Sequence, residues 1–166
     1  RGASEIFPEE FELYQSVIPE NERGNLINAF YNRLTSKDRS ERAKAAYAWT
    51  RWEMSTSYLM PKELSIKKAS NDNFSDSFAR IECHYFINNI FLEDNYILNN
   101  ISMIKNIPVS VVQGRYDIVC PMRSAWDLKK ELPSSRLYVI DNAGHSIKEI
   151  GITNKLVDLT NELANS

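Results

Sequence analysis

The sequence has 166 residues with 20 Lys and Arg against 22 Asp and Glu, so its net charge is −2 at neutral pH. This balance excludes a generally basic nucleic-acid binder, because neutralising phosphates requires an excess of positive charge. An apolar fraction of 43% and a length that suits about one domain also exclude a disordered chain.

Sequence features that direct a chain into a membrane or out of the cell are missing. No run of about 18 apolar residues is present, so no transmembrane helix is expected. Residues 1–5 lack the apolar core of a signal peptide. Cys83 and Cys120 are too few for a disulfide framework or a zinc site. We therefore expect a cytoplasmic protein with reduced thiols and with neither nucleic acid nor membrane as a partner.

Glycine is scarce, with 5 in the chain, and the motifs that depend on glycine are missing. The sequence contains no G-x-G-x-x-G, no G-x-x-x-x-G-K-[ST] and no G-x-S-x-G. The nearest match to the third motif is residues 144–148, in which Lys148 replaces the final glycine. These absences exclude a glycine-rich phosphate loop and a complete nucleophile elbow of the usual kind.

Residues 1 to about 95 show the apolar spacing of helices. Pro8 followed by Glu9 and Glu10 is typical of a helix start, because proline fits the first turn and acids favour it. A polar stretch at residues 70–73 separates the third predicted helix from the fourth. Two of the four predicted helices begin near Pro8 and near Pro19. The other two cover about residues 38–58 and 76–90.

The pattern changes near residue 99, and we predict a helical domain at residues 1–98 and a second domain at residues 99–166. Residues 107–114 are rich in β-branched side chains and end at glycine, which is typical of a buried strand. Strands and helices alternate from there with short connections, and this predicts a parallel α/β unit. The predicted order is a strand at 107–114, a helix at 124–132, a strand at 136–140 and a helix at 152–163.

The predicted sheet is incomplete in this chain. Two strands are too few for a stable parallel sheet covered on both faces. Open strand edges also pair readily with other chains. Either another chain completes the sheet, or further residues precede Arg1 in the natural protein.

Asp117 follows the first predicted strand and His145 follows the second. Ligand and catalytic sites of α/β sheets lie at the C-terminal ends of parallel strands, so the two loops should lie side by side. A buried carboxylate beside a histidine fixes the imidazole tautomer and stabilises the imidazolium formed during proton transfer. The alternative is that Asp117 only caps the next helix and that His145 is structural or exposed. His84, in a helix among aromatic residues, is expected to pack or to form a local hydrogen bond.

Short motifs occur along nearly the whole chain. They are GAS at residues 2–4, FPE at 7–9, AW at 48–49, WE at 52–53, ARIE at 79–82, HYF at 84–86, GRYDIVCP at 114–121 and AGHS at 143–146. In this order they closely resemble the proline iminopeptidase (prolyl aminopeptidase) family of α/β-hydrolases. The resemblance implies the C-terminal half of such an enzyme, with a helical cap followed by the last strands of the α/β core.

The resemblance implies a serine exopeptidase that releases N-terminal proline from peptides, with no metal ion or organic cofactor. Asp117 would be the acid of the Ser-His-Asp triad, and His145 would be the general base. The family's serine elbow and its His-Gly-Gly-Pro oxyanion loop have no counterpart in this sequence. Both would belong to the missing N-terminal half of the hydrolase core, so the chain alone is predicted to be inactive.

The resemblance also implies residues that bind the substrate. Glu53 and Glu82 match the cap glutamates that bind the charged N-terminal nitrogen, and carboxylates in a partly desolvated pocket hold such a group strongly. The residues alone instead favour solvated acids on helix faces. Cys120 matches a cysteine near the family's site, although a small buried residue is the alternative. Cys83 departs from the family motif and is expected to pack.

Two other functions remain open at this point. An esterase or an epoxide hydrolase shares the Asp117 and His145 loops but has no need for an anionic site at Glu53 and Glu82. The second alternative is that this chain is a non-catalytic interaction module, which resembles a hydrolase but has no serine elbow.

Overall fold

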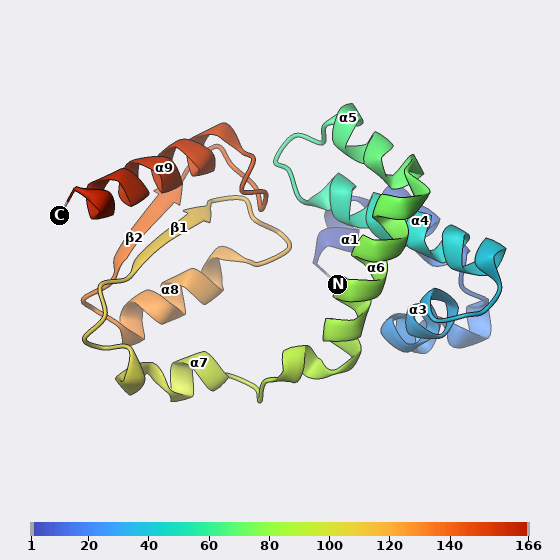
Figure 1. Cartoon of the computed structure of the whole chain (residues 1–166), viewed down its shortest axis with the longest axis horizontal. Helices are drawn as coiled ribbons and strands as arrows, with labels where there is room; N and C mark the ends of the chain where they lie inside the picture. The colour runs from blue at the N-terminus through green and yellow to red at the C-terminus, as the bar shows by residue number, and fades with distance from the viewer. Residues whose placement is uncertain (1, 166) are drawn as a thin grey trace. The chain divides into compact units, whose positions relative to one another are not determined.

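The computed structural model describes residues 2–165 (Figure 1). The chain forms two compact units, one of Arg1–Thr56 with Pro61–Glu93 and one of Ser57–Met60 with Asp94–Ser166. Segment Ser57–Met60 therefore belongs to the second unit, although helices of the first unit flank it in sequence. The predicted division into domains at residues 1–98 and 99–166 stays a prediction.

The described part of the first unit is helical. Asn71 caps the helix at Asp72–Ile87, because its side-chain oxygen accepts a hydrogen bond from the N–H of Phe74 at 3.0 Å. This cap explains why that helix begins four residues before the predicted start at Asp76. The elements are α1 (Ala3–Ile6), α2 (Pro8–Ser16), α3 (Leu26–Leu34), α4 (Arg39–Thr56), α5 (Glu63–Ile66), α6 (Asp72–Ile87) and the short 3-10 helices Glu20–Asn25, Lys67–Ser70 and Asn89–Phe91.

Aromatic rings form the centre of the first unit's core. The ring of Tyr14 stacks on that of Phe30 with 4.4 Å between their centroids. Trp49 meets Phe30 edge to face at 5.3 Å, an arrangement that aromatic pairs favour. Cys83 is buried in this core, as expected from the sequence. The other buried members of the core are Ile18, Ala29, Leu34, Ala45, Ala46, Ala48 and Ala79.

The second unit contains two parallel strands, β1 (Ser110–Gly114) and β2 (Arg136–Ile140). Their register pairs Ser110 with Arg136 at one end and Gly114 with Ile140 at the other. Helices α8 and α9 lie on opposite sides of the strands (Figure 1). The expected parallel α/β unit with an incomplete sheet is thus confirmed. The helices are α7 (Tyr96–Asn99), α8 (Met122–Glu131), α9 (Ile150–Ala164) and the short 3-10 helix Ile101–Met103.

The first strand is shorter than the sequence predicted, because it begins at Ser110 and not at residue 107. Pro108 has no N–H group to donate within the predicted span. The second strand has its predicted bounds. Among the described residues, no helix is both long and apolar enough to cross a membrane.

Candidate active site

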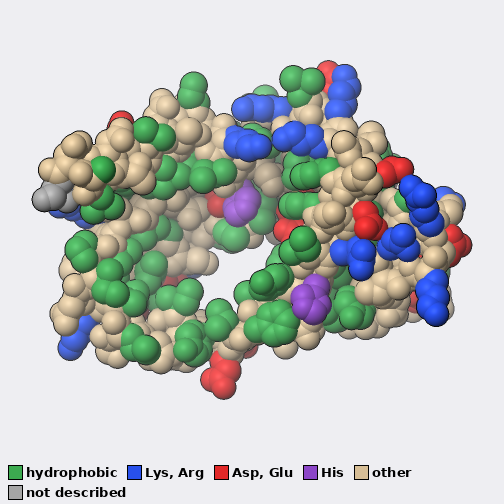
Figure 2. All heavy atoms as spheres, in the orientation of Figure 1, with side chains coloured by type: hydrophobic (Ala, Val, Ile, Leu, Met, Phe, Trp, Pro, Cys, Tyr) green, Lys and Arg blue, Asp and Glu red, His purple; other side chains and the backbone are tan. Residues whose placement is uncertain are grey.

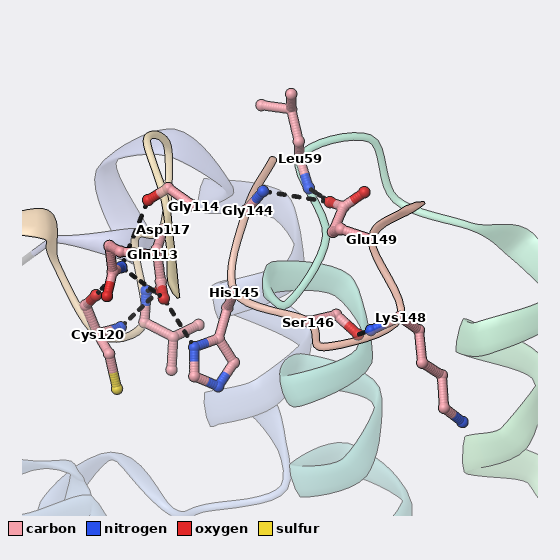
Figure 3. Close-up of polar contacts among 11 residues, drawn as sticks. Leu59, Gln113, Gly114, Asp117, Cys120, Gly144, His145, Ser146, Lys148 and Glu149 are labelled. Atoms are coloured by element: carbon pink, nitrogen blue, oxygen red, sulfur yellow. Dashed lines mark hydrogen bonds and ion pairs between the residues drawn. The ribbon is translucent and has the colours of Figure 1, made fainter. Parts of the chain in front are cut away.

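Asp117 and His145 lie on the loops that follow β1 and β2. Because these strands are parallel and adjacent, the two loops leave the same end of the sheet. Nδ1 of His145 lies 2.9 Å from Oδ2 of Asp117, within hydrogen-bond distance (Figure 3). The structure therefore brings the two predicted residues into contact, while their catalytic roles stay predictions.

The carboxylate of Asp117 is buried and accepts hydrogen bonds on both oxygens. Oδ1 accepts from the backbone N–H groups of Val119 and Cys120 at 3.0 and 2.8 Å. Oδ2 also accepts from the side-chain amide of Gln113 at 3.1 Å. Helix α8 has Pro121 at its N-cap and receives no side-chain hydrogen bond there, so Asp117 does not cap this helix. The turn after β1 instead holds the carboxylate in one orientation.

Electrostatics favour the charged forms of both partners. Burial raises the pKa of Asp117, but hydrogen bonds from His145 and from the N–H of Cys120 outweigh burial and bring it below its usual value. The hydrogen bond to Asp117, followed by one to the side chain of Cys120, raises the pKa of His145 to about 10. The side chain of His145 is 37% exposed. In this chain the imidazole therefore carries a positive charge at neutral pH.

The titration of His145 checks this pair directly. Because the pKa of His145 is raised on folding, its protonation contributes stability fully below about pH 6.5 as long as Asp117 stays ionised, and this contribution is lost as pH rises through about 10. We expect the NMR signals of the His145 ring to titrate near pH 10 in this chain and at a clearly lower pH in Asp117→Asn, because the hydrogen bond to Asp117 is the largest cause of the raised pKa. A His84→Gln variant assigns the signals. Equal titration of His145 with and without the Asp117 carboxylate would contradict the ion pair.

Backbone contacts with segment Ser57–Met60 hold the loop that carries His145. The carbonyl oxygen of Ser57 accepts hydrogen bonds from the N–H groups of His145 and Ser146 at 3.0 and 2.7 Å. The helix that precedes this segment ends at Thr56, and Pro61 has no N–H with which to pair the Ser57 carbonyl in a further helical turn. The predicted continuation of that helix to residue 58 was therefore wrong by two residues.

Two polar side chains that the sequence analysis did not single out take part in this region. Gln113, in β1, donates to Asp117 as described above, and an amide inside a β-branched strand was a signal that could have found it. Glu149, just before α9, accepts through Oε1 from the N–H of Leu59 at 2.7 Å and from that of Gly144 at 3.2 Å. Because the contact with Leu59 joins positions 90 residues apart, no local pattern reveals it.

Two glycines allow these segments to approach closely. A Cβ on Gly144 would lie 2.6 Å from the backbone nitrogen of Leu59, and one on Gly114 would lie 1.9 Å from the carbonyl oxygen of Gly144. Both contacts are with backbone atoms, which cannot rotate away. Close packing at these two positions therefore requires glycine.

Replacing Gly144 by Ala should destabilise the fold by about 1–3 kcal/mol, because the backbone must shift to admit the methyl group. Gly114→Ala should cost at least as much. Gly24→Ala is the matched control, since no atom lies within 4 Å of its added Cβ, and it should change stability by less than about 1 kcal/mol. Urea unfolding midpoints measure all three. A Gly144→Ala midpoint equal to that of Gly24→Ala would contradict the close approach.

In the first unit, Glu53 on α4 and Glu82 on α6 are half-buried. Oε2 of Glu82 accepts a hydrogen bond from Nε1 of Trp49 at 2.6 Å. Burial, and then the negative charges of Glu53 and Glu82 among others, raise the pKa of Tyr14, so both carboxylates lie within electrostatic range of one buried phenol. The two acids are therefore not fully solvated helix-face residues. Their role as substrate ligands stays a prediction.

Cys120 is exposed, so the alternative of a small buried residue does not hold. Its side chain contributes to the raised pKa of His145, which places the thiol near the imidazole, and its predicted role in substrate binding stays a prediction. His84 is exposed on α6, where its ring lies 5.5 Å from that of Phe91. Within residues 2–165, no group of three or more His, Cys, Asp or Glu side chains is arranged to hold a metal ion.

Comparison with known families identifies the class of protein. The sequence profile of the alpha/beta hydrolase fold matches residues 1–151. The chain therefore belongs to the α/β-hydrolase fold family. This agrees with the parallel strands and with the acid and the histidine on the loops that follow them.

Within this family, the chain is similar to proteins named proline iminopeptidase, which confirms the resemblance predicted from the sequence. It is 52% identical over 160 residues to a probable proline iminopeptidase of Leptolyngbya boryana, covering 96% of this chain and 50% of that protein. It is 48% identical over 158 residues to one of Arabidopsis thaliana, covering 94% and 42%. It is 43% identical over 164 residues to one of Xanthomonas citri, covering 98% and 52%. The chain spans about half the length of these curated relatives.

Proposed function

We propose that this chain is the C-terminal half of a serine exopeptidase that releases proline from the N-termini of peptides. Residues 1–98 serve as its helical cap and residues 99–166 as the last part of its α/β core. The observation that carries the proposal is the 2.9 Å hydrogen bond between His145 and Asp117 at the ends of adjacent parallel strands. The names of the similar proteins support the substrate class.

The partner of this chain in the proposal is an N-terminal half that supplies the remaining strands of the core. A groove of ≈ 880 Å³ between the start of β1 and α9 supports this partner. Its apolar lining includes Ile107, Pro108, Val109, Leu156, Leu159 and Leu163. Apolar side chains gather over this part of the chain in Figure 2, and Ile107 and Leu163 are more than half exposed. Such a surface is costly to leave in water and is typical of an interface.

In the proposed reaction, a serine of the N-terminal half attacks the carbonyl carbon of the first residue. Because Nδ1 of His145 is held by Asp117, Nε2 is the nitrogen that takes the serine proton. The C–N bond of the peptide then breaks, and His145 returns this proton to the leaving amine. Water attacks the acyl-enzyme with His145 again as base, which releases proline and regenerates the serine.

A general base must be neutral before it can take a proton, whereas His145 is charged at neutral pH in this chain. The N-terminal half would change this by covering the exposed part of the ring. Burial disfavours the imidazolium and lowers the pKa of a histidine. We therefore expect assembly of the core to bring the pKa of His145 down toward the working pH, where general bases are most effective.

The proposed anchor for the substrate's charged nitrogen is the pair Glu53 and Glu82. Their half-buried setting beside Trp49 and Tyr14 supports this role, because a charge-assisted hydrogen bond is stronger when water is partly excluded. The compartment proposed for the enzyme is the cytoplasm, and the two cysteines, which form no disulfide, are compatible with it.

The test compares this chain with the complete polypeptide on proline p-nitroanilide. The complete polypeptide should hydrolyse it, and it should not hydrolyse N-acetylproline p-nitroanilide, whose nitrogen carries no charge. The chain alone should be inactive on both. Turnover by the chain alone would overturn the assignment of the nucleophile to another part of the protein. Equal rates on the two substrates would favour an esterase-like α/β-hydrolase without an amine site.

A further inference from the structure

The carboxylate of Glu149 joins two backbone segments that are distant in sequence. Its Oε1 atom lies 2.7 Å from the backbone nitrogen of Leu59 and 3.2 Å from that of Gly144. Both N–H groups donate to this single oxygen, as the dashed lines in Figure 3 show. Gly144 is the residue directly before His145, so the carboxylate acts on the backbone that carries the imidazole.

The same loop also contacts the turn that carries Asp117. The carbonyl oxygen of Ala143 accepts a hydrogen bond from the N–H of Tyr116 at 3.0 Å. Ala143 is only 1% exposed, and the neighbouring Gly144 has no room for a Cβ. A displacement of this loop would therefore move His145 relative to Asp117. Fixing the loop against segment Ser57–Met60 therefore keeps the imidazole of His145 beside the carboxylate of Asp117.

We propose that Glu149 is a positioning residue, which holds His145 in line with Asp117 by tying Gly144 to Leu59. The relevance of this tie to catalysis rests on the function proposed above, whereas the tie itself does not. Helix capping is the obvious competing role, because Glu149 occupies the N-cap position of α9. Its side chain makes no capping hydrogen bond there. Its Oε1 atom instead accepts hydrogen bonds from Leu59 and Gly144.

Three substitutions of Glu149 separate these roles. Glu149→Asp keeps the charge and is a better helix cap, but it is one methylene shorter and should not reach both N–H groups. Glu149→Gln removes the charge but keeps an acceptor oxygen at the same reach. Glu149→Ala removes both. Asp158→Ala, at an exposed acid of α9, is the matched control.

The measurements are amide hydrogen exchange at Leu59 and Gly144 and the NMR titration of the His145 ring, on the isotope-labelled full-length protein. In Glu149→Asp we expect exchange at both amides to become about tenfold faster, as on loss of one hydrogen bond. The titration point of His145 should fall by about one pH unit as its contact with Asp117 loosens. Glu149→Gln and Asp158→Ala should stay within about threefold of the wild-type exchange rates and within a few tenths of a unit of the wild-type titration point.

If amide exchange and the His145 titration in Glu149→Asp match those of the wild type, the proposal is overturned. A negative charge or a helix cap at residue 149 would then be sufficient to position His145. Behaviour of Glu149→Gln like that of Glu149→Asp would overturn it as well, since the placed acceptor is the essential element. If Glu149→Ala does not fold, the Asp and Gln variants still decide. None of these readouts requires turnover, so failure of the peptidase proposal would be recognised separately.

Discussion

Asp117→Asn should lower kcat of the complete enzyme on proline p-nitroanilide by about 10⁴-fold, as expected for loss of the acid in a Ser-His-Asp triad. The asparagine can present an N–H to Nδ1 of His145. The ring then carries its proton on Nε2, the nitrogen that has to accept the proton of the serine. KM should change little, because Asp117 contacts the imidazole and not the substrate.

The matched control for this substitution is Asp141→Asn. Asp141 directly follows β2, but its side chain is 90% exposed and lies 3.8 Å from Arg115, so its ion pair should contribute little. Its kcat should remain within about twofold of the wild type. A drop of less than about tenfold in Asp117→Asn would show that the acid of the triad lies elsewhere.

Glu53→Gln and Glu82→Gln should each lower kcat/KM on proline p-nitroanilide by about 10²-fold, because under the proposed function each removes a charged partner of the substrate's ammonium in a partly desolvated site. Glutamine keeps the size of the side chain, and at residue 82 its oxygen can still accept from Nε1 of Trp49. The loss therefore reports on charge and not on packing. Hydrolysis of p-nitrophenyl acetate, which has no amine, should remain within about threefold of the wild type.

Glu41→Gln is the control for these two substitutions, since Glu41 lies on α4 with Glu53 but is exposed. It should leave both substrates unaffected within about twofold. Equal losses on the amine substrate and the ester in Glu82→Gln would indicate a structural role in the Trp49 contact. Unchanged kcat/KM in both Glu53→Gln and Glu82→Gln would contradict the proposed binding of the substrate's nitrogen by these carboxylates and favour the esterase alternative.

The strands and their order were predictable because their signals are local. Residues 136–140 form β2 as predicted, since a short run of apolar, aromatic and β-branched side chains bounded by polar residues indicates a strand without tertiary context. The parallel pairing followed from the alternation of strands and helices. Placement of Asp117 and His145 after the strands then sufficed to predict that the two residues would lie on neighbouring loops.

The supports of the site were not predictable in this way. Glu149 reaches Leu59 across 90 positions, and nothing around residue 149 marks it as different from other surface glutamates. Likewise, the carbonyl of Ser57, directly after α4, accepts two N–H groups from the distant His145 loop. Tertiary hydrogen bonds of this kind leave no periodic signal in the local sequence.

Under the proposed function, this chain supplies the acid and the base of a triad whose serine lies in an N-terminal half. The DNA sequence upstream of the codon for Arg1 decides whether such a half exists. The proposal predicts an in-frame His-Gly-Gly-Pro segment followed by a G-x-S-x-G elbow. A start codon at or near Arg1, with neither motif, would contradict it and leave Asp117 and His145 as remnants in a non-catalytic interaction module.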